Sequence, residues 1–311
     1  MYKDKRIAVV VPAYNVENHI TEVLRSIRDF VDHIIVVDDA SQDGTYKRCK
    51  DFDDKRLIIL RSPKNLGVGG ATITGFKMAM KLDADVVVKM DGDGQMDALH
   101  LKKLIEPLIS EDYSYAKGNR FLHSYELEKM PKIRLFGNFA MTFLTKLTSG
   151  YWHIFDPQNG YVAIRVEALK EMDLNRIAKR YFFENDMLVH LNIHNHRIKD
   201  VPIPAIYGDQ PSFMKIHRIL FSFPFYLFKR FWYRIYQKYI LRDFSPIALF
   251  LFTGLPLVLW GMAYGTYIWW RALDTGVPAT TGTVMLAVLP FLVGFELLLQ
   301  ALILDIHETP R

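Results

Sequence analysis

Short apolar runs alternate with amphipathic helical stretches through the first two thirds of the chain. The apolar runs are rich in Val and Ile and have the length of buried strands, whereas elsewhere the apolar side chains recur at helical spacing. This alternation predicts an α/β domain with a mostly parallel sheet. The predicted strands are residues 6–11, 33–38, 56–60, 85–90 and 113–120, and the predicted helices are 17–30, 69–81, 97–109 and one that opens at Asp43.

Two long apolar segments follow near the C-terminal end. Residues 246–270 carry no charge, and residues 283–304 carry only Glu296. Each segment exceeds the ~20 residues that a helix needs to cross a bilayer, so we predict a two-helix transmembrane hairpin. Glu296 is costly in lipid and is expected to face protein or water, with Gln300 on the same helix face one turn later.

The pattern therefore predicts three parts. Residues 1–212 form the α/β domain, residues 213–243 form amphipathic juxtamembrane helices interrupted at Pro224, and residues 244–311 contain the hairpin.

Charge and cysteine content add an orientation. The net charge is only +5, but seven basic residues lie just before the hairpin, where they are expected to meet anionic lipid rather than nucleic acid. Because the connector between the spans is nearly neutral, we expect the α/β domain on the cytoplasmic face. A single cysteine, Cys49, and a polar N-terminus without the apolar core of a signal peptide agree with that expectation. The basic residues are Lys215, Arg218, Lys229, Arg230, Arg234, Lys238 and Arg242.

Polar motifs directly follow three predicted strands, at the edge where parallel sheets bind ligands. They are residues 12–15, Asp38 with Asp39, and residues 91–95. Asp91 and Asp93 stand one residue apart on a glycine-bearing turn and can share a hard divalent cation, Mg²⁺ or Mn²⁺. Asp38 and Asp39 are acceptors placed to meet a base or ribose.

A glycine-rich segment, residues 65–71, lacks the spacing of a dinucleotide or Walker loop, so we interpret it as a close helix contact.

Six motifs occur in a specific order: VVPAYN (10–15), VDDASQDGT (37–45), PKNLGVGGA (63–71), MDGDGQMD (90–97), KGNR (117–120) and DPQNGY (156–161). Over residues 6–215 the set resembles the family 2 glycosyltransferases with a GT-A fold, a Rossmann-like, mostly parallel α/β sheet. The nearest group is the polyprenyl- and dolichyl-phosphate hexose synthases, including dolichol-phosphate mannose synthase and GtrB-type enzymes. The resemblance implies inverting transfer of a hexose from a UDP- or GDP-linked sugar to undecaprenyl or dolichyl phosphate, and a homo-oligomer such as a tetramer.

The resemblance also assigns roles, residue by residue. The nucleotide-sugar positions are Pro12, Tyr14, Asn15, Asp38, Asp39, Asp91 and Gln95; the metal positions are Asp91, Asp93 and Gln95; the acceptor-phosphate positions are Arg120, Arg134, Ser212 and Lys215. One departure is that Val16, followed by Glu17, stands where family members often have an acid.

The expected catalytic residues are Asp156, Asp93 and Arg120. Asp156 could orient the acceptor or act as base, and Glu184 and Asp186 are rival carboxylates whose ordinary role is helix capping. A phosphate nucleophile is already ionised near neutral pH, so positioning by basic residues is expected to matter more than a base.

Two alternatives stay open. A processive polysaccharide synthase uses the same fold, but its Q-x-x-R-W motif is absent from this sequence. A non-catalytic membrane scaffold or lipid-sugar translocase subunit would not need the Asp91 and Asp93 pair.

Overall fold

The computed structural model describes residues 1–120, 132–204 and 216–310. Contacts between Cα atoms divide the chain into two units, residues 1–231 and residues 232–309. Each unit is described below by itself.

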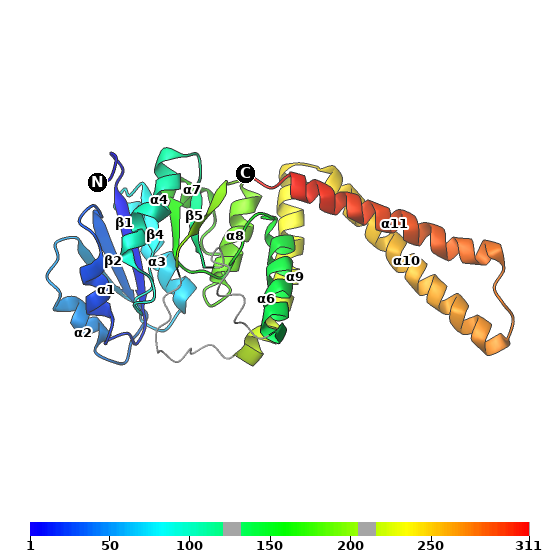
Figure 1. The fold of residues 1–311 in the computed structure, drawn as a ribbon, viewed down its shortest axis with the longest axis horizontal. Helices are drawn as coiled ribbons and strands as arrows, with labels where there is room; N and C mark the ends of the chain where they lie inside the picture. Colours follow the sequence, from blue (N-terminus) through cyan, green and yellow to red (C-terminus); the bar gives the residue numbers. More distant parts are fainter. Residues whose placement is uncertain (121–131, 205–215, 311) are drawn as a thin grey trace. The chain divides into compact units, whose positions relative to one another are not determined.

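The first unit is built on a seven-stranded sheet with the order β3-β2-β1-β4-β6-β5-β7 (Figure 1). The pairs β1–β2, β1–β4, β2–β3 and β5–β7 are parallel, whereas β6 runs antiparallel to both β4 and β5. The strands are β1 (Ile7–Ala13), β2 (His33–Asp38), β3 (Leu57–Arg61), β4 (Val86–Lys89), β5 (Tyr115–Asn119), β6 (Val162–Arg165) and β7 (Ile198–Pro202).

Helices follow the strands as the predicted alternation requires. The helices of this part are α1 (Ile20–Ser26), α2 (Thr45–Lys50), α3 (Val68–Lys81), the short η1 (Ala98–His100), α4 (Leu101–Ser110), α6 (Lys132–Ser149), α7 (Val166–Glu171), α8 (Phe183–Ile193) and α9 (Ile216–Tyr236). The predicted fold class, a mostly parallel α/β sheet, is confirmed. The antiparallel β6 is the one departure among the described strands.

Both faces of the sheet are buried, which explains why its central strands are continuous apolar runs. Along β1, Ile7, Val9 and Val11 face a core shared with α1 and α4, while Ala8 and Val10 face a core shared with α3, α7 and α8. All seven residues of β1 are buried. The ends of β1, β2 and β4 are therefore held rigidly, and the loops that leave them start from fixed positions.

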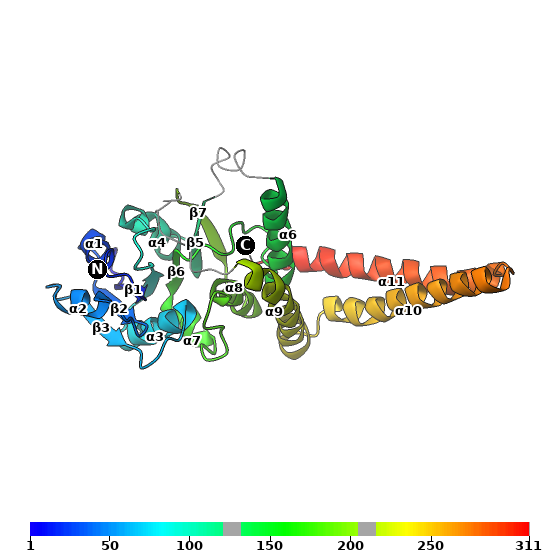
Figure 2. The same cartoon turned by 90° about the horizontal axis from the view of Figure 1, so that it is seen from below.

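Helices α6 and α9 lie next to each other in the first unit (Figures 1 and 2). Phe223 and Leu227 of α9 form a small core with Phe182, and the Thr148 hydroxyl of α6 donates to the Leu227 carbonyl at 3.3 Å. The predicted interruption at Pro224 is wrong, because α9 continues through it. Phe223 and Leu227, before and after Pro224, pack in this core and offset the hydrogen bond that the missing N–H removes.

The second unit is a helical hairpin. Helix α10 (Pro246–Thr275) and helix α11 (Thr281–His307) are long and apolar enough to cross a membrane. They approach closely at small residues: a Cβ on Gly254 would lie 2.9 Å from the Gly294 carbonyl oxygen, and one on Gly261 would lie 2.7 Å from that of Ala287. Glu296 accepts a hydrogen bond from Gln300 at 2.9 Å, which confirms their shared face.

The expectation that the basic residues before the hairpin all face lipid is wrong for Lys238, whose side chain is buried, and for Arg234. Its side chain is fully buried and pairs with both carboxylate oxygens of Asp305, at 2.7 and 3.0 Å. The Tyr239 hydroxyl donates to the same carboxylate at 2.7 Å. These contacts join the six-residue π-helix η2 (Gln237–Arg242) and the end of α9 to the C-terminal end of α11. Arg234 thus stabilises the second unit internally.

Candidate active site

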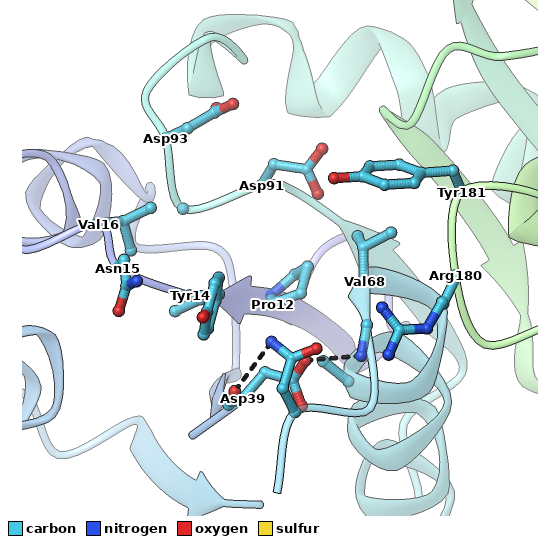
Figure 3. Close-up of a pocket in the computed structure, with 15 residues that line it drawn as sticks. Pro12, Tyr14, Asn15, Val16, Asp39, Val68, Asp91, Asp93, Arg180 and Tyr181 are labelled. Carbon is cyan, nitrogen blue, oxygen red and sulfur yellow. Dashed lines mark hydrogen bonds between the residues drawn. The ribbon is translucent and has the colours of Figure 1, made fainter. Parts of the chain in front are cut away.

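A pocket of about 450 Å³ opens at the carboxyl ends of β1, β2 and β4 (Figure 3). This is the edge of the sheet at which the sequence predicts a ligand. The lining residues are Pro12, Ala13, Tyr14, Asn15, Val16, Asp39, Asn65, Gly67, Val68, Ala71, Asp91, Gly92, Asp93, Arg180 and Tyr181. The pocket thus gathers Pro12, Tyr14, Asn15, Asp39, Asp91 and Asp93 from the predicted set, and Asp38 and Gln95 are not among its lining residues.

Asp91 and Asp93 enter the pocket from the turn after β4. The turn is shaped by Gly94, whose φ of +81° is open to glycine, and by the Gln95 amide, which donates to Asp93 Oδ1 at 3.0 Å. Gln95 therefore contributes its backbone to this turn. Burial, together with the negative charge of Asp91, raises the pKa of Asp93. Two carboxylates that repel each other on one turn fit a divalent cation with oxygen ligands, because its charge relieves the repulsion.

Asp39 lies between the pocket and the glycine-rich turn. Its two carboxylate oxygens accept hydrogen bonds from the backbone amides of Leu66 and Gly67, both at 2.8 Å, so the side chain fixes the start of α3. Asp38 is fully buried beneath, where it pairs with Arg61 at 3.1 Å and accepts from the Ser41 amide. The predicted contact of Asp38 with a base or ribose is therefore not supported by its position.

The first polar motif is held by the loop after β2. The Asn15 side chain, on a residue with φ of +52°, accepts from the Gln42 amide at 2.9 Å. Val16 lines the pocket in place of the family's acid, whereas Glu17 turns away and accepts from the Gly44 amide at 2.9 Å. Tyr14 is 43% exposed, which leaves its ring open to the pocket.

The glycine-rich segment makes a close contact, as predicted, but mainly with the loop before α8 rather than with a helix; only Phe183, the first residue of α8, adds a helix contact. A Cβ on Gly67 would lie 2.7 Å from the Lys179 carbonyl oxygen, and one on Gly69 would lie 2.7 Å from that of Ala178. The Gly70 amide donates to the Lys179 carbonyl at 2.9 Å. The segment also lines the pocket through Gly67, a second role that the spacing argument did not include.

Sequence reasoning missed Arg180 and Tyr181. Both belong to the loop that rests on the glycine-rich turn, and the Tyr181 ring extends toward Asp91 (Figure 3). The next residue, Phe182, packs against Phe223 of α9, with ring centroids 5.4 Å apart. Basic, aromatic and acidic residues stand side by side in residues 179–186, KRYFFEND, and this composition is typical of a functional loop. No rule of sequence spacing places this loop next to the ends of β1, β2 and β4, which lie far away in the chain.

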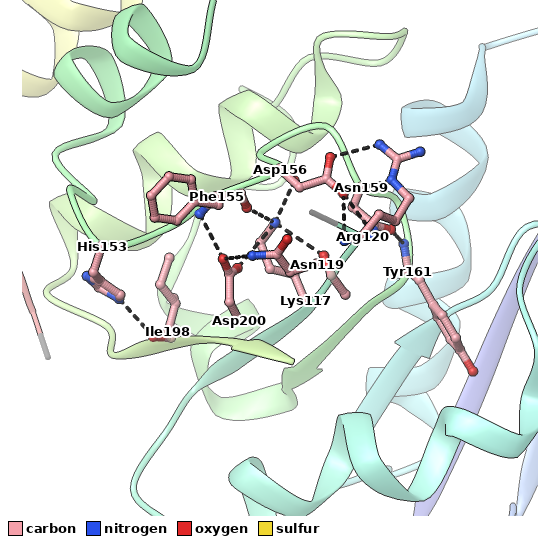
Figure 4. Close-up of polar contacts among 11 residues, drawn as sticks. Lys117, Asn119, Arg120, His153, Phe155, Asp156, Asn159, Tyr161, Ile198 and Asp200 are labelled. Atoms are coloured by element: carbon pink, nitrogen blue, oxygen red, sulfur yellow. Dashed lines mark hydrogen bonds and ion pairs between the residues drawn. The ribbon is translucent and has the colours of Figure 1, made fainter. Parts of the chain in front are cut away.

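A second polar cluster surrounds Asp156, next to the end of β5 (Figure 4). Arg120 binds both oxygens of the Asp156 carboxylate, Nε at 2.7 Å and Nη2 at 2.8 Å. Burial alone would raise the pKa of Asp156, but the hydrogen bonds from Arg120 and the charge of Lys117 outweigh burial and lower it. The buried Lys117 ammonium donates to the backbone carbonyls of Phe155 and Asp156 at 2.7 and 2.6 Å. The structure thus brings two of the predicted catalytic residues together as an ion pair.

The loop of residues 156–161 connects this cluster to the metal motif. Asn159 donates to the Asp156 carboxylate at 3.3 Å, and a Cβ on Gly160 would lie 3.2 Å from Asp91 Oδ2. On the same side of Gly160 the Lys89 ammonium lies 2.7 Å from Asp91 and 3.5 Å from Glu184. Burial lowers the pKa of Lys89, but the charges of Asp91 and Glu184 outweigh it and raise the pKa, so this group stays cationic.

The remaining predicted residues lie elsewhere. The rival carboxylate Asp186 is fully buried and pairs with Arg230 of α9 at 2.7 Å, and burial raises its pKa to about 6. Arg134 falls on α6, but its side chain is outside the described ones, and Ser212 and Lys215 lie outside the described residues. Their predicted contacts with an acceptor phosphate stay predictions.

Comparison with known proteins agrees with this geometry. Residues 8–173 match the model of glycosyl transferase family 2, and the chain belongs to that family. It is therefore a glycosyltransferase.

Two curated relatives give more detail. The chain is 36% identical over 221 residues to UDP-N-acetylglucosamine--dolichyl-phosphate N-acetylglucosaminyltransferase of Methanococcus voltae, covering 66% of this chain and 88% of the relative. It is 30% identical over 206 residues to undecaprenyl-phosphate mannosyltransferase of Micrococcus luteus, covering 65% and 84%.

Among solved structures, glucosyl-3-phosphoglycerate synthase of Mycobacterium tuberculosis in complex with UDP superposes with a TM-score of 0.58. The sequences are 22% identical, and the match covers 73% of this chain and 80% of that one. This likeness confirms the predicted GT-A fold.

Proposed function

We propose that the protein transfers a hexose or N-acetylhexosamine from a nucleotide diphosphate sugar to a polyprenyl phosphate, undecaprenyl or dolichyl, with inversion. The observation that carries the proposal is the pocket at the end of β4, which joins the Asp91 and Asp93 pair to Tyr14 and Asp39. The named activities of the relatives from Methanococcus voltae and Micrococcus luteus, both of which transfer a sugar to a lipid phosphate, support the acceptor class.

Each side of the pocket has a proposed partner in the donor. Pro12, Tyr14 and Asn15 hold the base and ribose, and Asp91 and Asp93 face the diphosphate. Mg²⁺ or Mn²⁺ on these two carboxylates would offset the charge of the departing nucleotide. Arg180, at the same pocket, adds a cation that can bind a phosphate oxygen.

We place the acceptor phosphate near Arg120. A lipid phosphate is ionised near neutral pH and attacks the sugar without losing a proton to a base. The lowered pKa of Asp156 makes this carboxylate a poor base at neutral pH. Its two hydrogen bonds with Arg120 fix the orientation of the guanidinium. Of the two roles predicted for Asp156, we therefore favour orientation of the acceptor site.

A transmembrane hairpin is consistent with a lipid acceptor that is embedded in a bilayer. Helices α10 and α11 would anchor the enzyme, and the catalytic unit would lie on the cytoplasmic face, where nucleotide sugars are made. We also propose that the catalytic domain ends at residue 212 and the juxtamembrane helices at residue 243. We propose further that the protein forms a homo-oligomer. A processive synthase or a non-catalytic scaffold would not show single transfer to a lipid phosphate.

The test is a screen of donors and acceptors with the purified full chain in detergent and Mn²⁺. UDP-N-acetylglucosamine, UDP-glucose and GDP-mannose are each incubated with undecaprenyl phosphate, dolichyl phosphate or no lipid, and the products are identified by mass spectrometry. We expect one donor to give a lipid-phosphate-linked monosaccharide that requires the lipid. Folded protein that transfers no sugar from any donor, or that makes polymer, would contradict the proposal.

A further inference from the structure

A buried lysine, Lys89, ends an otherwise apolar strand, two residues before Asp91 of the metal motif. Lys89 closes β4, between β1 and β6 in the sheet, and its side chain is 1% exposed. Burying an ammonium is costly unless it is paired and hydrogen-bonded. The charge in the run Val86-Val-Val-Lys89 therefore calls for an explanation beyond strand packing.

The Lys89 ammonium is held on three sides. It lies 2.7 Å from Asp91 Oδ1 and 3.5 Å from Glu184 Oε1, and it donates to the Gly160 carbonyl at 3.2 Å. These three groups come from the turn after β4, the first turn of α8 and the loop before β6. The ammonium thus connects the metal motif to two other elements of the fold.

Position 160 leaves no room for a side chain next to the ammonium. A Cβ on Gly160 would lie 2.5 Å from Lys89 Nζ, 3.2 Å from Asp91 Oδ2 and 3.4 Å from Glu184 Oε1. Gly160 is not among the residues with positive φ, so an alanine here would disturb the neighbours rather than its own backbone. Both the position of the ammonium and the absence of a side chain at 160 therefore define where the Asp91 carboxylate sits.

The charges are also matched to a divalent cation. When all the carboxylates are ionised, the pocket and the Lys89 cluster hold four carboxylates and two cations, which leaves two negative charges, the charge that one Mg²⁺ or Mn²⁺ neutralises. The carboxylates are Asp39, Asp91, Asp93 and Glu184, and the cations are Lys89 and Arg180. Mutation of a group that orients a metal ligand typically lowers metal affinity by about 10–100-fold.

We propose that Lys89 is a positioning residue for the sugar transfer: its ammonium fixes Asp91 Oδ1 inward, so that the other carboxylate oxygen is presented to the divalent cation and the donor diphosphate. Glu184 and the Gly160 carbonyl hold the ammonium in place. The inference rests on the proposed function, because it assigns Asp91 to the metal. It goes beyond that function by assigning roles to Lys89, Glu184 and Gly160.

The first test uses Lys89→Met, which keeps much of the side-chain volume and removes the charge. Mn²⁺ binding to the purified full chain with UDP is measured by electron paramagnetic resonance, alongside transfer. We expect Mn²⁺ to bind ~10–100-fold more weakly, the usual cost of losing a partner of a metal ligand. If Lys89 merely repelled the cation, its removal would tighten Mn²⁺ binding, and tighter or unchanged binding overturns the proposal.

Lys117→Met is the matched control. Lys117 is also 1% exposed and also pairs with a carboxylate, Asp200 at 3.3 Å, but it belongs to the Asp156 cluster. We expect a comparable loss of thermal stability with unchanged Mn²⁺ affinity. Equal loss of Mn²⁺ affinity in both variants would show a general effect of removing buried lysines and would overturn the specific role of Lys89.

A second variant keeps every charge in place. Gly160→Ala inserts the Cβ next to the Lys89 ammonium, and it is expected to weaken Mn²⁺ binding in the same direction, whereas Gly282→Ala, which meets no neighbouring atom, is expected to leave binding and transfer unchanged. If Lys89→Met does not fold, the comparison of Gly160→Ala with Gly282→Ala tests the proposal instead. Wild-type protein that binds no Mn²⁺ and transfers no sugar would refute the proposed function, whereas normal wild-type activity with unaffected variants would refute only the role of Lys89.

Discussion

The two side chains of the Arg120–Asp156 ion pair differ in burial, and this difference predicts how much each single variant lowers the stability of the fold. The Asp156 side chain is 2% exposed, whereas that of Arg120 is 41% exposed. Removing Arg120 leaves a buried carboxylate without its main partner, but removing the charge of Asp156 leaves a guanidinium that water can reach. The two single variants should therefore differ in cost.

Loss of one partner of a buried pair costs about 3–5 kcal/mol. Because Arg120 is partly exposed and Lys117 also lowers the pKa of Asp156, we reduce this to about 2–3 kcal/mol for Arg120→Ala. Asp156→Asn should cost only about 1 kcal/mol, since asparagine still accepts a hydrogen bond and tolerates the φ of +49° at this position. The double variant should be more stable than Arg120→Ala alone, because no buried carboxylate is left at position 156 without its guanidinium partner.

The assay is the thermal midpoint of the purified protein in detergent. For a unit of this size we expect Arg120→Ala to lower the midpoint by roughly 5–10 °C, Asp156→Asn by roughly 2–4 °C, and the double variant by less than the first. Arg48→Ala, which breaks an exposed pair with Glu17 at 3.8 Å, is the control and should change little. Additive losses in the double variant, or a larger loss from Asp156→Asn, would refute the reasoning.

Three further variants test other parts of the fold. Gly75→Ala would place a Cβ inside van der Waals contact of a methyl group of Val10. We expect a loss of about 1–3 kcal/mol in the free energy of unfolding, visible as a lower unfolding midpoint, and an unchanged midpoint would refute the close contact. Burial lowers the pKa of His190 to about 4, so its neutral form contributes stability above about pH 6.5 that is lost as pH falls toward 4. His190→Gln should remove up to about 3 kcal/mol of this loss of stability in acid. Parallel profiles of stability against pH for wild type and variant would contradict this expectation. Arg234→Met leaves the buried Asp305 with the Tyr239 hydroxyl but without its cation, and it should destabilise the second unit by about 3–5 kcal/mol. The measurement is the protease resistance of the hairpin, and wild-type resistance would count against this pair.

The sequence predicted the central sheet well, because its strands are long apolar runs buried on both faces. It did not predict β6 and β7. Strand β6 has four residues and leads directly into α7, and β7 contains Lys199 and Asp200. Short or polar strands of this kind lack the periodicity on which a prediction depends, and only their pairing with β4 and β5 defines them.

The candidate site shows the same division. Tyr14, Asp39, Asp91 and Asp93 follow strands, and the rule for parallel sheets correctly placed them in one pocket. Arg180 reaches that pocket from a loop far along the chain, and only tertiary packing against the glycine-rich turn brings it there.

The burial of Asp38 was not predicted for a related reason. It is adjacent to Asp39, but neighbouring residues at a strand end point in different directions, and Asp38 turns into the protein toward Arg61. Motif spacing identifies the strand end but does not show which of two adjacent carboxylates faces the ligand.

The central claim is that the carboxylates after β4 carry sugar transfer to a lipid phosphate. The most direct measurement is the turnover of Asp91→Asn with the donor, the polyprenyl phosphate and Mn²⁺, compared with Asp97→Asn. Asp97 lies on the same segment but caps η1 through the Leu99 amide at 2.8 Å, a role that asparagine fills equally well. We predict at least a ~100-fold loss for Asp91→Asn and near wild-type turnover for Asp97→Asn. Full turnover by folded Asp91→Asn protein would contradict the account.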